Sequence, residues 1–306
     1  MASDDLRARL AALLGFAPPE APLAFSVLDV RERDGYAEHR VAFAGAEGAV
    51  PAYLLVPDGE GPFPGVVAHH QHHRQWHWGK SEVAGRVGDP LQAFGPALAR
   101  RGVVVLAPDA VGFEDRRATG PGIEPRDGDG PQYMNDMSYR LVRGRLLMTT
   151  VLGDAAAALS ALTAHPAVDA ARVGVLGHSM GGTTTLFHAA LDERVMFAAA
   201  SGAASSYARR MADRTPIELA QVVPGILGVA DIDGVAGLVA PRRLLLVSAT
   251  EDPYSVDADA IDEAVADRFP PGALRHARYD GGHALTAERF ELIVDWAAET
   301  AATCRA

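Results

Sequence analysis

The chain has 306 residues, of which 48% are hydrophobic and 22% are charged, an ordinary balance for a globular protein. Its formal net charge of -11 would be repelled by a phosphate backbone, so nucleic acid is not expected as a partner. No apolar run reaches the roughly 18–20 residues that a membrane span needs. We expect one globular domain over residues 1–306 that acts on a small molecule, not at a membrane, and its assembly into a homo-oligomer stays open.

The N-terminal sequence MASDDLRARLAALLGF carries Asp4 and Asp5 where a secretory signal peptide has Lys or Arg. It predicts instead an amphipathic helix within residues 1–20, capped by Ser3, with leucines along one face. The only cysteine, Cys304, permits no internal disulfide, which fits a reducing compartment. We therefore expect a cytoplasmic protein.

Short apolar segments recur along the chain and predict the strands of a sheet. Residues 39–45 and 50–57 flank a Gly-containing turn, which is the signal of an antiparallel hairpin. Later segments are continuously apolar, as in parallel strands that helices cover on both faces; they are 65–69, 103–108, 172–177, 195–200 and 243–248. Segments with helical spacing lie between the strands. This alternation predicts an α/β fold with a mostly parallel, doubly wound sheet and helices on both faces.

Two segments fit the alternation poorly and are interpreted as lid-like insertions. Residues 112–136 are rich in Gly, Pro and charged residues, and residues 202–234 interrupt the order of strands and helices a second time. Long excursions in a compact α/β domain often form lids or pocket walls. We therefore expect both insertions to shape a substrate pocket.

The segment 173-VGVLGHSMGG-182 contains the pattern G-x-S-x-G between a predicted strand and a predicted helix. This is the context of a nucleophile elbow, a sharp turn that exposes the hydroxyl of its central serine, here Ser179. Gly177 and Gly181 would leave room for the crowded backbone, and the positive end of the following helix would face a developing oxyanion. A bare G-x-S-x-G also occurs in idle turns, but this context favours a catalytic serine.

A serine nucleophile needs a base, and the base needs an acid that orients it. After an elbow serine, the acid comes next in the chain and the histidine last. Asp252 follows a predicted strand within ATEDPYS, and Glu251 and Asp257 are its rivals. His283 follows the last predicted strand and a Gly-Gly loop within LRHARYDGGHAL. We predict a catalytic triad of Ser179, Asp252 and His283.

The motifs G-H-S-M-G-G, T-E-D-P and D-G-G-H, in this order, resemble those of the α/β-hydrolases. The segments 241-PRRLLLVSATEDPYSVD-257, 223-VPGIL-227 and 103-VVVLAPDAVGFEDRR-117 are similar to the dienelactone hydrolase-like and acetyl xylan esterase-like branch. The resemblance spans most of the chain and implies the α/β-hydrolase fold and a serine hydrolase that requires no cofactor. Its motifs are specific to the superfamily and much less specific for a substrate.

The stretch 69-HHQHHRQWHWGK-80 departs from the H-G-G or H-G-x that many of these hydrolases carry. In the family pattern, the loop at this point supplies one backbone N–H of the oxyanion hole. Alignment of VVAHHQ with that pattern places His70 on the family histidine and Gln71 on the glycine position. The resemblance therefore implies that the backbone N–H groups of Gln71 and Met180 form the oxyanion hole.

The same stretch also permits a metal site or a wall of the substrate pocket. Zinc accepts imidazoles, but adjacent histidines in an extended segment point to opposite faces, and no Cys or helical H-x-x-x-H pair completes a familiar set. We predict no metal here, while metal binding by the cluster of five histidines at 69–77 stays open. We favour a pocket wall, with Arg74 or Lys80 near a substrate carboxylate. The candidate substrate contacts are His70, Trp76, Trp78, Arg116, Tyr133 and Tyr207.

These observations predict a serine hydrolase that cleaves a carboxylic ester or lactone through an acyl-enzyme on Ser179. Amide hydrolysis or acyl transfer with the same triad, a non-catalytic small-molecule binder on the same fold, and a metal-dependent hydrolase are the alternatives. The acyl and alcohol groups of the substrate do not follow from the sequence.

Overall fold

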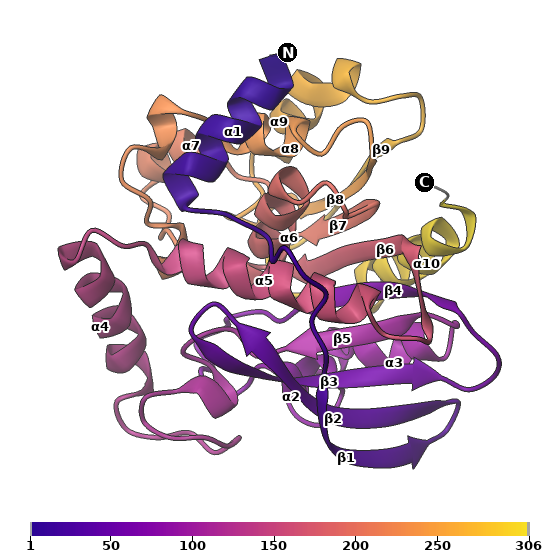
Figure 1. Cartoon of the computed structure of the whole chain (residues 1–306). Coiled ribbons are helices and arrows are strands. Elements are labelled where there is room, and N and C mark those ends of the chain that lie inside the picture. The colour runs from indigo at the N-terminus through magenta and orange to yellow at the C-terminus, as the bar shows by residue number, and fades with distance from the viewer. Residues whose placement is uncertain (1, 305–306) are drawn as a thin grey trace.

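The structure, a computed structural model, describes residues 2–304. Its centre is a nine-stranded sheet with the order β1-β2-β3-β5-β4-β6-β7-β8-β9 (Figure 1). The strands are β1 (Ser26–Arg33), β2 (Tyr36–Gly45), β3 (Gly48–Pro57), β4 (Phe63–His69), β5 (Val104–Pro108), β6 (Val168–His178), β7 (Phe197–Ser201), β8 (Arg243–Ala249) and β9 (Leu274–Tyr279).

The sheet is mostly parallel, as the continuous apolar runs predict. Strands β4 to β9 pair in parallel, whereas β1, β2 and β3 form an antiparallel extension that joins β5 through β3. The predicted hairpin is confirmed, with Gly45 opposite Gly48 at its turn. Strand β1 was not predicted, because its sequence SVLDVRER lies at the sheet edge with most side chains exposed and lacks a clear apolar face. The α/β-hydrolase expectation for the fold is confirmed.

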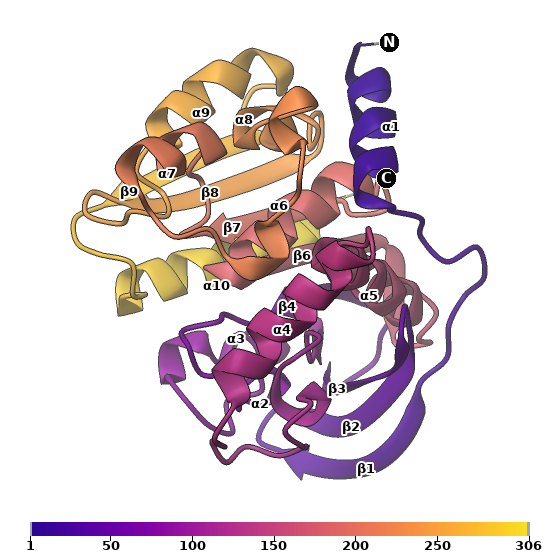
Figure 2. The same cartoon turned by 90° about the vertical axis from the view of Figure 1, so that its left-hand side faces the viewer.

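Helices cover both faces of the sheet (Figure 2). One face carries α1 (Ala2–Leu14), α5 (Leu147–Thr163), α6 (Met180–Leu191), α8 (Ile232–Gly237) and α9 (Ala258–Val265). The other carries α2 (Lys80–Val83), α3 (Phe94–Ala99) and α10 (Ala287–Thr303). Successive residues of a strand alternate between the two cores: in β4, Val67 faces the first, and Val66 and Ala68 face the second.

The remaining helices lie in or near the loops. They are α4 (Asp129–Val142), α7 (Tyr207–Asp213) and the 3₁₀ turns η1 (Pro90–Gln92), η2 (Glu114–Arg116), η3 (Leu219–Gln221), η4 (Ile226–Gly228) and η5 (Ala266–Arg268). Among residues 2–304, no single helix is long and apolar enough to cross a membrane. The consecutive helices α4 and α5 reach that length and composition only together, with a bend of 104° between them.

The N-terminal helix is shorter than expected and begins earlier. It starts by Ala2, so Ser3 lies inside the helix and is not its cap, and it ends at Leu14, not near residue 20. Met1 lies outside the described residues. Leu10 and Leu14 are fully buried in the core, and the Arg7 guanidinium donates to the carbonyls of Ala190 and Leu238 at 3.0 Å. The helix is thus docked against the ends of α6 and α8.

The two predicted insertions contact each other. Residues 112–136 contain η2 and the first half of α4, and residues 202–234 contain α7, η3 and η4. The Tyr133 hydroxyl of α4 donates to the Glu218 carboxylate of the second insertion at 2.8 Å. Both insertions also contribute to a small apolar cluster with Met180, which directly follows the predicted nucleophile; its buried members are Phe113, Tyr133, Leu147, Met180 and Ala220. The insertions therefore meet beside the elbow.

Candidate active site

Ser179 lies at the sharp turn between β6 and α6, with φ 58° and ψ -120°. A left-handed φ is costly for a residue other than glycine and persists only where its surroundings impose it. Here the surroundings are close backbone contacts. A Cβ on Gly177 would lie 2.4 Å from the backbone of Gly181, and a Cβ on Gly181 would lie 2.1 Å from the His69 carbonyl oxygen. The elbow therefore depends on these glycines, as the sequence pattern implies.

The three predicted triad side chains lie within hydrogen-bonding distance of one another. His283 Nε2 is 2.8 Å from Ser179 Oγ, and His283 Nδ1 is 2.9 Å from Asp252 Oδ1. They come from three loops that follow β6, β8 and β9, so the parallel strands deliver them to one edge of the sheet. The arrangement provides a nucleophile, a base and an acid that orients the base.

The Asp252 carboxylate is buried and fully engaged. Burial alone would raise its pKa, but the hydrogen bond and charge of His283, the Ser255 hydroxyl at 2.7 Å and the Tyr254 backbone N–H at 2.9 Å bring the pKa of Asp252 below its ordinary value. The rival acid Asp257 instead accepts from the Ser206 hydroxyl at 2.6 Å. Asp252 is therefore the ionised partner of His283 at neutral pH.

Two aromatic rings flank the His283 imidazole. Tyr254 packs against it edge-on at 4.8 Å between ring centroids, and His178 lies at the same distance with an interplanar angle of 31°. Burial, and then the neighbouring His283, lower the pKa of His178 to about 3. A neutral ring beside His283 does not repel the imidazolium that would form on it.

The loop after β4 contacts the first turn of α6. A Cβ on Gly181 would also lie 2.9 Å from the His70 carbonyl oxygen, so the peptide groups of residues 69–71 lie against the elbow. The Met180 N–H is the first of α6 and has no carbonyl acceptor within that helix. The predicted oxyanion donors, Gln71 and Met180, are thus brought to adjoining backbone segments.

The His70 side chain holds this loop in place through two hydrogen bonds. Its Nε2 accepts from the Ala110 backbone N–H at 3.1 Å, so its Nδ1 carries the proton and donates to the Gln71 carbonyl at 2.8 Å. Burial lowers the pKa of His70 to about 4. The ring lines a separate cavity of about 30 Å³. His70 therefore fixes the loop in its neutral form, in place of the substrate contact that the sequence predicts.

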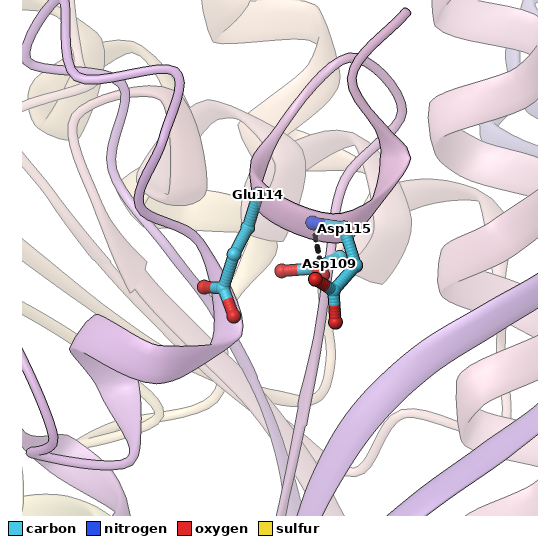
Figure 3. A group of neighbouring side chains, drawn as sticks. All are labelled: Asp109, Glu114 and Asp115. Carbon is cyan, nitrogen blue, oxygen red and sulfur yellow. Dashed lines mark hydrogen bonds between the residues drawn. The ribbon is translucent and has the colours of Figure 1, made fainter. Parts of the chain in front are cut away.

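Lys80 anchors the other end of the histidine loop. Its ammonium is buried and lies 2.8 Å from Asp109 Oδ2 and from Asp115 Oδ2, and it also bonds Glu114. Figure 3 shows these three carboxyl groups turned toward one shared space. Burial opposes the charge on Lys80, but Asp109 and Glu114 outweigh it and raise the pKa of Lys80. Lys80 is thus a structural cation, not a substrate-binding one.

In the described part of the chain, no three histidines of the loop bring their ring nitrogens within 4.8 Å of one another. Among residues 2–304, the single group of three potential ligands with atoms within 4.8 Å of one another is Asp109, Glu114 and Asp115, where the Lys80 ammonium lies. Four of the five rings contact other aromatic or imidazole rings, as His72 does with Trp76, Phe113 and Tyr133, whereas His73 is exposed and lines the cleft. Burial lowers the pKa of His72 to about 4. His70 and His72 therefore pack in the neutral state.

A cleft of about 320 Å³ opens beside His283. Its lining combines one large aromatic side chain and aliphatic groups with amides, carboxyl groups and imidazoles; it includes Gln71, Trp78, Glu82, Asp89, Gln92, His178, His283 and Leu285. Of the predicted substrate contacts, Trp78 lies here. The position of the cleft next to the Ser179–His283 pair makes it the candidate substrate site.

The other predicted substrate contacts have partners within the protein. The Arg116 guanidinium bonds Asp154 at 2.6 Å, with both side chains mostly buried. Tyr133 is buried against Phe113, and the Tyr207 hydroxyl donates to the Gln221 carbonyl at 3.0 Å. Trp76 packs over Gly130, where a Cβ would lie 2.9 Å from its ring. These residues hold the insertions and the histidine loop together and do not line the cleft.

Sequence reasoning missed Glu82 and Gln92, two buried polar residues of the cleft. Both follow the histidine loop in segments without a motif. Burial raises the pKa of Glu82 to about 7, although the bond from Gln71 opposes this shift. A polar residue next to a histidine-rich loop is only weak evidence of a role in the site. The burial that makes Glu82 and Gln92 notable is known only from the fold.

Comparison with known proteins shows the family of the chain. A family model of the dienelactone hydrolase family matches residues 50–223. The chain thus has the fold of the α/β-hydrolase class. It belongs to the dienelactone hydrolase family, and the resemblance drawn from its motifs is confirmed.

Among curated proteins, the chain is 31% identical over 194 residues to "Putative hydrolase YtaP" of Bacillus subtilis (strain 168). The alignment covers 62% of this chain and 61% of that relative, so it spans under two thirds of the relative's length.

Solved structures share the fold at low identity. A Bacteroides fragilis NCTC 9343 protein named "putative acetyl xylan esterase" aligns with a TM-score of 0.70 and 17% identity, over 90% of this chain and 74% of its own. A glucuronoyl esterase from Solibacter usitatus aligns with a TM-score of 0.65 and 16% identity, over 96% and 91% of the two chains.

A methyl group at Gly181 should destroy the elbow. Because the Cβ of Gly181→Ala would lie 2.1 Å from a backbone oxygen, we expect a loss of about 3 kcal/mol or more in the free energy of unfolding. Gly228→Ala is the matched control, since its Cβ would meet nothing within 4 Å. Urea denaturation measures both, and equal stability of the two variants would contradict the contact.

Replacement of Glu82 should alter the pH dependence of stability. The folded-state pKa of about 7 exceeds that of the unfolded chain, so the unfolded chain releases its proton first and ionisation destabilises the fold as pH rises from about 4.5 to about 7. Glu82→Gln removes this effect. The difference in the free energy of unfolding between Glu82→Gln and the wild type should therefore shift in favour of the variant by up to about 3 kcal/mol from pH 5 to pH 8. A difference that stays constant with pH would contradict the assignment.

Proposed function

We propose that the protein is a carboxylic ester hydrolase that cleaves an ester or lactone through an acyl-enzyme on Ser179. The observation that carries this proposal is the continuous relay from Ser179 Oγ through His283 to Asp252, with separations of 2.8 and 2.9 Å. Membership of the dienelactone hydrolase family supports hydrolysis. The names of the solved structures with the same fold, acetyl xylan esterase and glucuronoyl esterase, support esters as the substrate class.

In the proposed mechanism, His283 Nε2 removes the proton of the Ser179 hydroxyl as its oxygen attacks the substrate carbonyl. The carbonyl oxygen gains negative charge, and the backbone N–H groups of Gln71 and Met180 stabilise it. Asp252 holds the imidazole tautomer with its proton on Nδ1 and stabilises the imidazolium. The elbow presents the hydroxyl without further movement of the backbone.

His283 next acts as an acid and then again as a base. The imidazolium of His283 gives its proton to the departing alkoxide, and the alcohol leaves. His283 then takes a proton from a water molecule that attacks the acyl-enzyme. The imidazolium returns this proton to Ser179 Oγ as the bond between Oγ and the acyl carbon breaks, and the carboxylic acid departs. The amides and imidazoles on the wall of the cleft beside His283 suit an alcohol group that carries a few hydrogen-bonding substituents.

Active-site labelling tests the nucleophile. A fluorophosphonate probe should attach to Ser179, as located by mass spectrometry of the labelled peptide, and activity on p-nitrophenyl acetate should disappear with the label. Ser179→Ala and His283→Ala should lose both. His276→Ala is the control, because its ring bonds Ser248 and Asp259 outside the relay. Labelling at another residue, or none, would contradict the proposal and favour a non-catalytic binder.

Metal removal separates the serine mechanism from a metal-dependent one. Since the proposed nucleophile, base and oxyanion donors are all groups of the chain, prolonged dialysis against EDTA should leave at least about 80% of the initial rate. The rate is measured again after addition of Zn²⁺. Loss of activity on chelation with recovery on Zn²⁺ would refute the serine mechanism in favour of the histidine cluster as a metal site.

A further inference from the structure

The carboxyl group of Glu82 lies on the wall of the cleft together with Gln71 and His283. Its side chain is only 3% exposed, and no step of the ester hydrolysis requires it. Its Oε1 accepts a hydrogen bond from Gln71 Nε2 at 3.1 Å. This contact links a buried carboxyl group to the residue whose backbone N–H is the proposed oxyanion donor.

The helix that carries Glu82 is anchored by buried hydrogen bonds. It belongs to the short helix α2, whose first residue is the buried cation Lys80. The next residue, Ser81, donates both its backbone N–H, at 3.0 Å, and its hydroxyl, at 2.6 Å, to Glu114. Two consecutive residues thus anchor α2 to the loop after β5, and Glu82 has little freedom to move.

The loop that follows α2 closes over the carboxyl group. The Asp89 backbone N–H approaches Glu82 Oε1 at 3.4 Å, and a Cβ on Gly88 would lie 2.7 Å from the same oxygen. The left-handed φ of +78° at Gly88 permits this close approach. The position of Oε1 is therefore set from two sides before it meets Gln71.

Gln71 is held at both ends. Glu82 fixes its side chain, and the His70 ring fixes its carbonyl oxygen at 2.8 Å. Between these two contacts, little rotation is left to the backbone of Gln71. An oxyanion donor works only when it is aimed at the developing charge before the reaction, so this fixation has a catalytic consequence.

We propose that Glu82 is a positioning residue of the oxyanion hole: its carboxyl oxygen holds the Gln71 side chain and thereby aims the Gln71 backbone N–H at the substrate oxyanion. The role rests on the proposed serine mechanism. It requires the reach of the side chain and not its charge, because a neutral carboxyl or an amide oxygen also accepts the bond from Gln71.

Two conservative variants separate reach from charge. Glu82→Asp keeps an ionisable carboxyl group but withdraws the oxygen by one methylene, and we expect kcat for p-nitrophenyl acetate to fall about 10-fold, less than the 10²–10³-fold loss on removal of a whole donor. Glu82→Gln keeps the reach and should stay within about 3-fold of the wild-type kcat. In both, KM should change by less than about 3-fold, since the oxyanion contact acts in the transition state.

A double variant tests whether Glu82 acts through Gln71. Gln71→Leu removes the amide side chain but keeps the backbone N–H, and it should lower kcat about as much as Glu82→Asp. The combination should lower kcat no further than either single variant. The proposal would be overturned if the double variant lost about 100-fold in kcat, the product of the two single losses. It would also be overturned if Glu82→Gln had a lower kcat than Glu82→Asp.

The controls distinguish this idea from lost stability and from failure of the serine mechanism. Glu38→Leu removes a carboxylate that is equally buried, at 3% exposed, but pairs with Arg33 and Arg86; it should lower the melting temperature and leave kcat unchanged. If Ser179→Ala is inactive while Glu82→Asp has the wild-type kcat, only the role of Glu82 is refuted. Activity in Ser179→Ala would refute the underlying mechanism.

Discussion

The close approach of the first turn of α6 to the end of β4 is the constraint on which the site depends. Gly181 lies against the carbonyl oxygens of His69 and His70, with no space for even a methyl group. This contact imposes the left-handed backbone of Ser179 and brings the peptide groups of the histidine loop beside the nucleophile. Once it is made, the parallel sheet needs only to deliver Asp252 and His283 from the loops after β8 and β9.

A second requirement is that the histidine loop after β4 remain rigid. It has Gln71 at the position where many of the hydrolases it resembles carry glycine. The protein meets this requirement with buried polar contacts: His70 bonds Ala110 and Gln71, and Lys80 lies among three carboxylates. Burial keeps His70 and His72 neutral, so they pack as flat rings that form hydrogen bonds and carry no charge. These two histidines thus have a structural role in the loop.

Much of the fold and the triad could be predicted from local sequence, because continuous apolar strands and the G-x-S-x-G turn are local patterns. Strand β1 could not, since an exposed edge strand such as SVLDVRER has no buried face to mark it. Lys80 was predicted near a substrate carboxylate, because its partner Glu114 lies 34 positions away in the chain. Glu82 was missed because no motif marks it and its burial follows only from the fold. Arg116, Tyr133 and Tyr207 were predicted to line the pocket. Arg116 instead bonds Asp154 of α5, Tyr133 joins the two insertions, and Tyr207 bonds within its own insertion.

We propose above all that the elbow and the histidine loop together hold the oxyanion that forms on the substrate attached to Ser179. A crystal structure of the enzyme inactivated with a small fluorophosphonate tests it most directly. We predict phosphorus bonded to Ser179 Oγ, with one phosphoryl oxygen about 3 Å from the backbone nitrogens of both Gln71 and Met180. A phosphoryl oxygen held elsewhere, with neither nitrogen within hydrogen-bonding distance, would contradict the account.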